Sequence, residues 1–192
     1  MTKLNLYTVS REYTDYLRQK DSNVPYTGGD KAARPFVGVV FQRSKFHYFV
    51  PFTSPKPKHL KMKNQIDFLK IENGTWGAIN LNNMIPVSVS ALSKIDLSEN
   101  SVDTQAEIDY KELLKNQLEW CNKNSDTLIK RAEHLYYLIT QGNPYPQLKQ
   151  RCCDFKTDEI MCLKYEKEHG VKTVVETSLE DKIKSTKQQN RL

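Results

Sequence analysis

The run Pro51-Phe52-Thr53-Ser54-Pro55-Lys56-Pro57-Lys58 holds the residues best suited to chemistry in this sequence. Two adjacent hydroxyls, a proline that stiffens the turn and two lysines can form an anion site without a metal ion. Hydroxyl and backbone N–H groups give directional hydrogen bonds to phosphate oxygens, and a lysine adds a point charge. The same residues would suit an ordinary polar turn between a strand and a loop, so the run alone is a weak signal of function.

Basic residues concentrate around this run. Residues 43–70 contain seven lysines and arginines against one acid, Asp67, so this segment alone has a net charge of +6. The whole chain of 192 residues also carries +6, and the remainder is therefore close to neutral. A local excess of this kind is typical of a protein that binds a polyanion, although a solvated lysine-rich loop would give the same count.

Other chemically active residue types form no comparable pattern. The four cysteines, which include the adjacent Cys152 and Cys153, form no CxxC pair and have no histidine at ligand spacing. We therefore expect reduced structural thiols and no metal site. His47 falls in an apolar strand, and His59 lies among lysines that would lower its pKa. Neither is a clear general base, and we expect no cofactor.

Short strands are expected to carry the run to its place in the fold. Strands are predicted at 4–9, 36–41, 46–50, 66–71, 76–81 and 85–89, where β-branched and aromatic residues dominate. Asn73-Gly74 joins the fourth and fifth strands and is a strong hairpin signal. A helix from Ser10, the expected N-cap, to Gln19 follows the first strand. The hydroxyl pair therefore lies where a strand ends and a lysine-rich loop begins.

The hydrophobic period changes near residue 100. Helices are predicted at 103–122, at 125–141 with Ser125 as the cap and Leu128, Ala132, Leu135 and Ile139 as an apolar stripe, and at 154–168. Strands followed by helices indicate the α+β class, with a small barrel-like antiparallel sheet packed against helices. We expect a single domain over 1–170, mainly β over 1–100 and mainly α over 101–170, and a polar, mobile tail over 171–192.

Several protein classes lack support in the sequence. The chain has no strand–glycine loop–helix phosphate motif, no GxSxG and no HExxH, which argues against nucleotide-hydrolysing and hydride-transfer enzymes. It also has no run of about 18 apolar residues and no secretory signal. We therefore expect a cytoplasmic protein with no membrane partner.

Four ordered features make the chain resemble the ToxN/AbiQ endoribonuclease toxins, and together with a looser fifth they span about residues 4–168. The features are Leu6-Tyr7-Thr8-Val9-Ser10 with Tyr13, Tyr16 and Leu17; Arg34-Pro35-Phe36-Val37-Gly38-Val39; Pro51-Phe52-Thr53-Ser54-Pro55-Lys56; Gly77-Ala78-Ile79-Asn80-Leu81 with Met84-Ile85-Pro86; and Cys153-Asp154-Phe155. The ordered set is specific although each piece alone is weak.

The resemblance implies an SH3-like barrel, of the Kid/MazF kind, elaborated by helices. It implies a toxin of a type III toxin–antitoxin system that cleaves cellular and phage RNA without a metal ion, acts in abortive phage infection, and leaves a 2′,3′-cyclic phosphate. The implied partner is a structured RNA antitoxin that the toxin cuts from a repeated precursor and that binds it directly, in a closed protein–RNA assembly.

The resemblance also implies roles for individual residues. Thr53 and Ser54 are the expected catalytic hydroxyls, and a basic residue ahead of the strand that begins at Phe36 is expected to meet the scissile phosphate. That residue is either Arg34 or Lys31, and we favour Arg34 because its fixed fork can grip two phosphate oxygens. The expected RNA-binding residues are Tyr13, Tyr26, Lys56, Lys58, Lys61 and Lys63.

Two other function classes fit the same sequence. A non-catalytic RNA-binding module with a small barrel would need only the basic loop and Tyr26 as a stacking platform. A toxin of similar barrel could instead poison a protein target such as gyrase. If the chain is a ribonuclease, the RNA supplies its own nucleophile, the 2′-OH, and the protein has to orient it and stabilise charge on the phosphorane.

Overall fold

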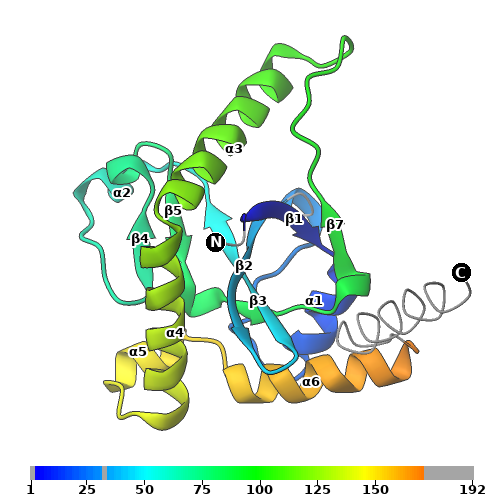
Figure 1. Cartoon of the computed structure of the whole chain (residues 1–192), viewed down its shortest axis with the longest axis vertical. Coiled ribbons are helices and arrows are strands. Elements are labelled where there is room, and N and C mark those ends of the chain that lie inside the picture. Colours follow the sequence, from blue (N-terminus) through cyan, green and yellow to red (C-terminus); the bar gives the residue numbers. More distant parts are fainter. Residues whose placement is uncertain (1–2, 32–33, 171–192) are drawn as a thin grey trace, which may run out of the picture.

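The computed structural model describes residues 3–31 and 34–170, and the predicted tail over 171–192 lies outside them. Within these ranges, seven short strands precede four of the six helices, arranged as Figure 1 shows. The strands are β1 (Asn5–Val9), β2 (Phe36–Arg43), β3 (Phe46–Thr53), β4 (Phe68–Lys70), β5 (Ala78–Asn80), β6 (Ile85–Pro86) and β7 (Leu92–Lys94). The helices are α1 (Arg11–Arg18), α2 (Pro57–Lys61), α3 (Gln105–Lys123), α4 (Ser125–Gln141), α5 (Pro146–Arg151) and α6 (Phe155–Glu168). Four short 3₁₀ helices, η1 (Gly29–Lys31), η2 (Glu72–Gly74), η3 (Leu81–Asn83) and η4 (Val89–Ala91), link the strands.

The strands form one antiparallel sheet in the order β4-β5-β3-β2-β1-β7. The central strand β3 pairs with β2 on one side, and on the other it pairs first with β6 and then with β5. The predicted α+β class is confirmed. The predicted small barrel is not confirmed, because β4 and β7 are the two ends of the path and do not pair with each other in the part of the chain that is described.

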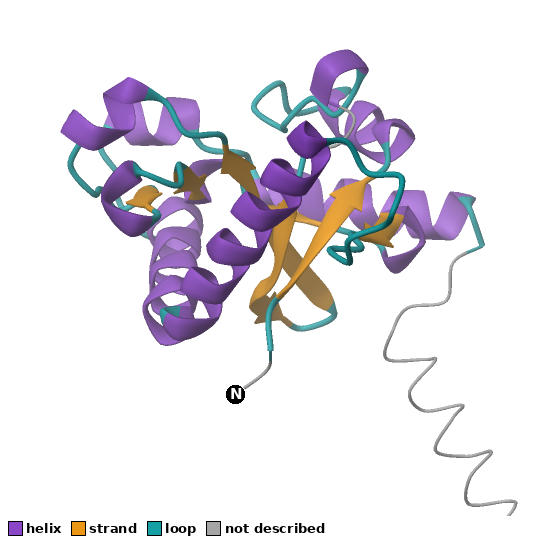
Figure 2. Cartoon of the chain, turned by 90° about the horizontal axis from the view of Figure 1, so that it is seen from above, coloured by secondary structure: helices purple, strands orange, loops and turns teal. Residues whose placement is uncertain are grey.

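An aromatic cluster joins the sheet to the helices. Tyr48 of β3 and Tyr136 of α4 are fully buried, and the Tyr136 ring stacks on Phe155 of α6 with a centroid distance of 5.7 Å. Both tyrosine hydroxyls donate hydrogen bonds to the carboxylate of Glu159, at 3.0 and 2.7 Å, which satisfies them in the core. Helices lie on more than one side of the strands (Figure 2), and α3 extends away from the sheet (Figure 1).

Helix capping explains where the long helices begin. The Thr104 side chain accepts from the backbone of Glu107 and the Glu107 carboxylate accepts from that of Thr104, a capping box that starts α3. The predicted helix at 125–141 is confirmed, with Leu128, Ala132 and Leu135 fully buried, but Ser125 is its first residue and Asn124 is the N-cap. The sequence analysis missed α2, α5 and β7, which are short and follow prolines or a polar loop.

The pairing register brings two distant segments to one point. Phe36 pairs with Pro51 and Val37 with Val50, and the Phe52 N–H donates to the Pro35 carbonyl at 2.9 Å. Continued by two residues beyond Phe36, this antiparallel register places Arg34 opposite Thr53. The end of β3 therefore lies against the segment before β2. No helix in the described ranges is both long and apolar enough to cross a membrane.

Candidate active site

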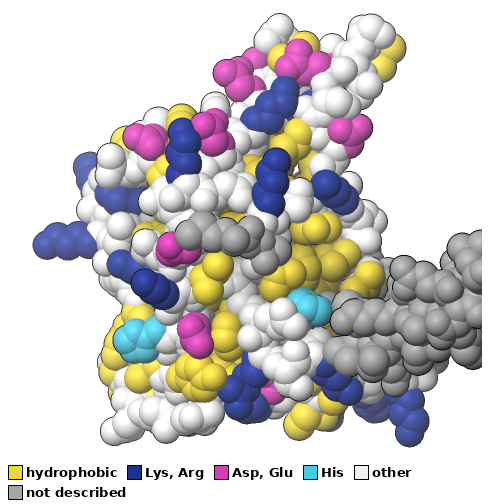
Figure 3. Space-filling view, in the orientation of Figure 1, with side chains coloured by type: hydrophobic (Ala, Val, Ile, Leu, Met, Phe, Trp, Pro, Cys, Tyr) yellow, Lys and Arg dark blue, Asp and Glu magenta, His cyan; other side chains and the backbone are white. Residues whose placement is uncertain are grey.

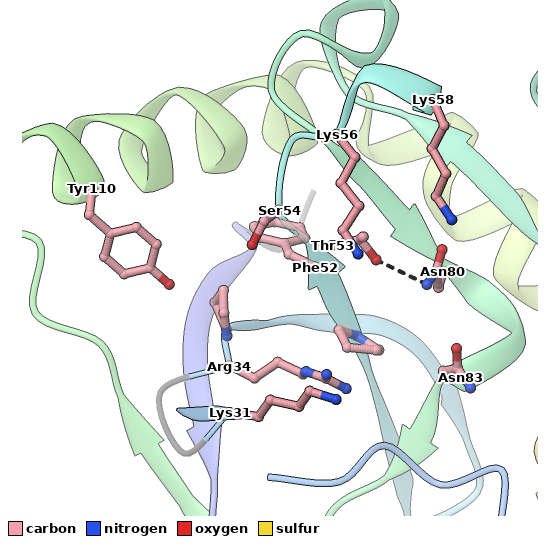
Figure 4. A pocket seen from close by; sticks show the side chains of 12 residues that line it. Lys31, Arg34, Phe52, Thr53, Ser54, Lys56, Lys58, Asn80, Asn83 and Tyr110 are labelled. Carbon is pink, nitrogen blue, oxygen red and sulfur yellow. Dashed lines mark hydrogen bonds between the residues drawn. The ribbon is translucent and has the colours of Figure 1, made fainter. Parts of the chain in front are cut away.

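A cavity of about 650 Å³ opens where β3 ends. Its wall combines four cationic side chains, two aliphatic hydroxyls, two amides and a phenol with a few apolar groups (Figure 4). The lining residues are Lys31, Arg34, Pro35, Pro51, Phe52, Thr53, Ser54, Lys56, Lys58, Asn80, Asn83 and Tyr110. All four residues predicted to be catalytic, together with Lys56 and Lys58, therefore line one cavity.

Arg34 and Lys31 enter the cavity side by side from the segment before β2 (Figure 4). The Arg34 N–H donates to the Lys31 carbonyl at 3.0 Å, and this hydrogen bond keeps the two residues close. Arg34 is half-buried and Lys31 is exposed, and burial lowers the pKa of the Arg34 guanidinium. An arginine remains protonated despite such a shift, so Arg34 supplies a poorly hydrated positive charge to the cavity that Thr53 also lines.

The Thr53 hydroxyl is oriented by Asn80 of β5. The Asn80 side-chain N–H donates to Thr53 Oγ1 at 3.0 Å, and the pairing of Thr53 with Ala78 brings the two strands together. Because Oγ1 accepts this hydrogen bond, its own hydrogen stays available to donate into the cavity. Asn80 belongs to one of the segments that resemble the family, but its contact with Thr53 could not be predicted, because it depends on the register of two strands.

Ser54 presents its hydroxyl on another side of the cavity from Thr53. Consecutive residues at the end of an extended strand point in opposite directions, and in Figure 4 the Ser54 hydroxyl is directed to the Tyr110 side. Tyr110 comes from α3 and is 41% exposed, and partial desolvation raises its pKa, so its phenol stays protonated near neutral pH. Asn83 of η3 completes the opposite wall. Tyr110 and Asn83 were also missed, because neither belongs to a local motif.

Lys56 and Lys58 reach down into the cavity from the start of α2 (Figure 4). Pro57 occupies the first turn of α2, where the missing N–H of a proline has no cost, and fixes the direction in which the lysines leave β3. Lys61 and Lys63 are exposed and lie outside the lining. On the face drawn in Figure 3, cationic side chains are interspersed with acidic ones, so basic charge is concentrated in the cavity more than across this face.

Neither predicted tyrosine lines the cavity. Tyr13 is fully buried, and its hydroxyl donates to the Pro86 carbonyl at 2.7 Å, so the prediction that Tyr13 lies near the mouth and binds RNA is wrong. Tyr13 lies on the side of α1 that faces the core. Tyr26 is 36% exposed and has the guanidinium groups of Arg11 and Arg18 within 6.0 Å of its ring centroid. It forms a separate cationic and aromatic surface.

Gly77 controls how closely β5 approaches the hydroxyl pair. Its φ is +92°, a conformation that favours glycine, and a Cβ at this position would collide with the Thr53 carbonyl oxygen. The same Cβ would also lie within 3.2 Å of the Ser54 carbonyl carbon and the Pro55 nitrogen. The glycine in the Gly77-Ala78-Ile79-Asn80 segment therefore allows the backbone of β5 to pack directly on the turn that carries Thr53 and Ser54.

His59 has a more buried position than the sequence indicated. His59 is 1% exposed rather than part of an open lysine loop, and its Nδ1 has no hydrogen-bond partner in the described ranges. Burial, followed by Lys58 and Lys56, lowers its pKa, so the imidazole is neutral near pH 7. Burial also lowers the pKa of His47, which is half-buried in β3. Neither histidine lines the cavity that contains Ser54.

A buried group of metal-ligating residue types exists elsewhere in the fold. One ligand atom from each of Asp21, Cys153 and Asp158 lies within 4.8 Å of the others. The sequence analysis did not anticipate this cluster, since Asp21 is distant in the chain. Burial, reinforced by Asp21 and Asp154, raises the pKa of the Asp158 carboxyl to about 9, so this carboxyl is neutral near pH 7. None of the three residues lines the cavity.

The arrangement around Thr53 is chemically an anion site. Arg34, Lys31, Lys56 and Lys58 supply positive charge, and two hydroxyls, two amides and a phenol can form directional hydrogen bonds. The lining contains no carboxylate, imidazole or thiol, so a divalent cation would meet positive charge and no strong ligand. A phosphodiester fits the charge of this site, and the residues that line it include no carboxylate or imidazole to act as a general base.

Comparison with known proteins places these residues in a family context. The model of a toxin family, "Toxin ToxN, type III toxin-antitoxin system", matches residues 5–162. The chain is 34% identical over 170 residues to endoribonuclease ToxN of Bacillus thuringiensis subsp. kurstaki, covering 86% of each chain. It is 30% identical over 174 residues to endoribonuclease AbiQ of Lactococcus lactis subsp. lactis, covering 85% of this chain and 90% of AbiQ.

Two solved structures agree with the sequence matches. The structure of AbiQ, described as a lactococcal anti-phage endoribonuclease of a type III toxin–antitoxin system, superposes with a TM-score of 0.73 at 27% identity and covers 86% of this chain and 99% of that one. A structure from a type III system in which a non-coding RNA pseudoknot selectively inhibits the toxin gives a TM-score of 0.71 at 32% identity, with the same coverage.

Proposed function

Because the chain belongs to the ToxN family of type III toxin–antitoxin toxins, we propose that it is a sequence-selective endoribonuclease toxin. The observation that carries this proposal is the convergence of Thr53, Ser54 and Arg34 in one cationic cavity. Relatives over most of the chain are named endoribonucleases, which supports RNA as the substrate. We also propose that the sheet is a variant of the family's SH3-like barrel in which the path from β4 to β7 stays open.

The proposed reaction is attack of the 2′-hydroxyl on the adjacent phosphorus. The P–O bond to the 5′-oxygen breaks, and the products are a 2′,3′-cyclic phosphate and a free 5′-hydroxyl. The 2′-hydroxyl loses its proton and the 5′-oxygen gains one, so no cofactor or oxidant takes part. The protein acts by holding the nucleophile in line, which can lower a barrier by roughly 7–11 kcal/mol at best.

Charge stabilisation is the second proposed contribution. The non-bridging oxygens gain negative charge in the phosphorane, and each well-placed donor to them is worth about 3–4 kcal/mol. Thr53, whose Oγ1 is fixed by Asn80, and Ser54 donate from two sides. Arg34 offers two parallel N–H groups, and Lys31 and Lys56 add charge. We infer a metal-independent reaction because the lining consists of cations and neutral donors.

The protonated phenol of Tyr110 is placed to donate a hydrogen bond on the Ser54 side of the cavity. We assign it to the orientation of the phosphate or the leaving 5′-oxygen. The lining offers no ordinary general base, and the neutral His59 belongs to the adjacent wall. Preorganised donors therefore carry most of the proposed rate enhancement.

We propose a structured RNA as the antitoxin, which the toxin cuts from a longer repeat and then retains. Retention needs slow dissociation, and many simultaneous phosphate contacts would provide it. Lys61, Lys63 and the Tyr26 surface lie outside the cavity and are available for such contacts. One RNA that contacts two protein copies would close a ring. The anti-phage description of AbiQ supports a role in abortive phage infection.

Incubation of the purified chain with total RNA in EDTA tests this function against its alternatives. RNA fragments with cyclic-phosphate ends are the expected result. Bound but intact RNA would instead identify a non-catalytic RNA-binding module, and RNA that stays intact and unbound would favour a poison of a protein target such as gyrase.

A further inference from the structure

The buried cluster of Asp21, Cys153 and Asp158 takes no part in the proposed reaction, because none of its residues lines the catalytic cavity. Its members come from three segments: the loop after α1, the link between α5 and α6, and the first turn of α6. Each residue is at most 6% exposed, and one ligand atom from each lies within 4.8 Å of the other two. The fold therefore collects two carboxyl groups and a thiol at one buried point.

Hydrogen bonds hold the backbone around this cluster in place. Asp21 Oδ2 accepts from the backbone N–H of Asp154 at 2.6 Å, and its Oδ1 accepts from that of Asn23 at 2.8 Å. The Cys153 N–H donates to the Asn82 carbonyl at 2.8 Å. A carboxylate oxygen has two lone pairs, so both oxygens of Asp21 can still bind a further partner.

The Asp158 carboxyl group has no structural partner that explains its burial. It is fully buried, and neither of its oxygens has a hydrogen-bond partner among the described residues. Burial, followed by the nearby carboxylates of Asp21 and Asp154, raises its pKa to about 9, so without a bound cation it keeps a proton. A proton alone does not satisfy the group, because the O–H then needs an acceptor and the other oxygen still needs a donor. A ligand is therefore expected at this point.

The cluster also has no protein cation to balance it. In the described part of the chain, no lysine, arginine or histidine forms an ion pair with Asp21, Asp154 or Asp158. Buried acidic groups are normally paired with a cationic side chain or coordinate a metal ion. Since the first kind of partner is missing, the charge and the residue types favour the second.

A cavity of about 350 Å³ adjoins the cluster and is separate from the catalytic cavity, with which it shares no lining residue. Asp21 and Cys153 line it, so an ion has a path to the cluster and a water molecule can complete its coordination. Lys149 and Lys156 also line this cavity, but Lys149 is exposed and Lys156 forms an ion pair with Glu159 at 3.0 Å. Neither lysine takes the place of a bound cation.

We propose that Asp21, Cys153 and Asp158 bind a divalent cation of the zinc class, which stabilises the fold. A thiolate beside two carboxylates suits Zn²⁺, whereas Mg²⁺ and Ca²⁺ prefer oxygen ligands alone. Ligand atoms of a tetrahedral zinc ion lie roughly 3.3–3.7 Å apart, so side-chain shifts of up to about 1.5 Å enclose the ion. Binding releases one proton from the thiol and one from the Asp158 carboxyl. The ion ties the loop after α1 to α6, which already packs against α1 (Figure 1).

Titration with Co²⁺, a spectroscopic substitute for zinc, tests the ligand set in the full chain after metal has been removed with EDTA and the EDTA washed out. One ion should bind per chain and produce the absorption of a cobalt–thiolate bond. Cys153→Ala should abolish this absorption, whereas Cys121→Ala, at another buried thiol, should retain it. Asp158→Asn keeps the thiol and the shape of the side chain, and should weaken binding at least about tenfold. Absence of the thiolate absorption in the wild-type chain, its persistence in Cys153→Ala, or unchanged affinity in folded Asp158→Asn would overturn the proposal.

Thermal unfolding shows whether the ion stabilises the fold. Zinc at about 100 times its dissociation constant should raise the Tm of the wild-type chain by roughly 5–10 °C. Asp158→Asn should show no such rise, and Asp109→Asn, at an exposed position of α3, should show the wild-type rise. Equal shifts in the wild-type chain and Asp158→Asn would contradict the proposal. Because the cluster lies outside the catalytic cavity, the metal-free chain should still cleave RNA below its Tm, so this test and that of the proposed function fail independently.

Discussion

The side-chain amide of Asn80 donates a hydrogen bond of 3.0 Å to Thr53 Oγ1, across the pairing of β5 with the end of β3. This contact fixes which way the threonine hydroxyl can donate. It also explains why two strands, rather than a loop alone, form the proposed phosphate site.

Replacement of Asn80 should slow cleavage without unfolding the protein. In Asn80→Ala the Thr53 hydroxyl can rotate, and the loss of one orienting hydrogen bond of about 0.5–1.5 kcal/mol corresponds to a decrease in kcat/KM of up to about tenfold. Single-turnover cleavage of a short oligonucleotide measures it. Asn143→Ala, at an exposed loop position, is the control. If folded Asn80→Ala cleaves RNA at the wild-type rate, Asn80 does not orient the Thr53 hydroxyl for cleavage.

Gly77→Ala should reduce both stability and cleavage. The new Cβ meets the Thr53 carbonyl, and φ at this position is +92°, so the turn with Ser54 has to move. Gly170→Ala is a matched control, because Gly170 also has a positive φ but no atom within 4 Å of its Cβ position. Its variant should lose some stability and keep the cleavage rate. Equal cleavage by both variants would show that the close approach of β5 is unimportant.

Arg34→Ala should be more damaging than Lys31→Ala. Arg34 lines the same cavity as Thr53 and is half-buried, whereas Lys31 is exposed to solvent that screens its charge. Arg34→Lys should recover only part of the loss, because a lysine cannot grip two phosphate oxygens. Cleavage rates of the three variants at fixed ionic strength test this order. A larger loss in Lys31→Ala would transfer the phosphate contact to Lys31.

The salt dependence of antitoxin binding should distinguish the inner from the outer lysines. Each neutralised phosphate contributes roughly 0.7–0.9 to the slope of log affinity against log salt. The pair Lys61→Ala and Lys63→Ala, outside the cavity, should reduce this slope while leaving cleavage of a trinucleotide unchanged. The double variant with Lys56→Ala and Lys58→Ala should reduce both the salt slope and the rate of trinucleotide cleavage. If the outer pair changes neither quantity, the RNA follows another face, such as the one around Tyr26.

Asp158→Asn should stabilise the protein at alkaline pH. The folded-state pKa of Asp158 is about 9, against about 3.9 for an unfolded aspartate. Both states are protonated below pH ~4; between there and pH ~9 only the unfolded state ionises, so stability falls by up to about 1.4 kcal/mol per pH unit. The asparagine variant removes this slope and should have the higher Tm at pH 8, by roughly 2–4 °C per kcal/mol.

Thermal unfolding between pH 5 and pH 9 measures that prediction. Asp109→Asn, at an exposed position of α3, is the control and should follow the wild-type curve. If Asp158→Asn unfolds with the same pH dependence as the wild-type chain, the Asp158 carboxyl is not the neutral group that its burial implies.

Sequence patterns predicted the elements whose formation depends on residues close together in the chain. The stripe of Leu128, Ala132 and Leu135 predicted α4, and Asn73-Gly74 marked the turn between the paired strands β4 and β5, where both residues have a positive φ. Tyr13, Tyr16 and Leu17 have the i, i+3, i+4 spacing of one helix face. Assignment of Tyr13 to the site came from the family likeness, and burial of the ring contradicts it.

The site residues also fall into two groups, those with a local sequence signal and those without one. Thr53, Ser54 and Arg34 could be found because they adjoin strand ends within short motifs. Asn80 and Tyr110 reach the cavity only through the β3–β5 register and the packing of α3, and neither relationship leaves a local signal. The open ends of the sheet at β4 and β7 likewise depend on which edges meet in space.

The most direct test of the central claim is cleavage of an RNA oligonucleotide that carries one 2′-deoxynucleotide at the cleavage position, measured in EDTA. The account predicts that the unmodified RNA is cut to a 2′,3′-cyclic phosphate and that the deoxy substrate binds but remains intact, because the nucleophile is missing. Ser54→Ala, folded as judged by its Tm, should fail to cut either RNA. Cleavage of the deoxy substrate, or activity that disappears in EDTA, would contradict a reaction driven by the 2′-hydroxyl and the donors around Thr53.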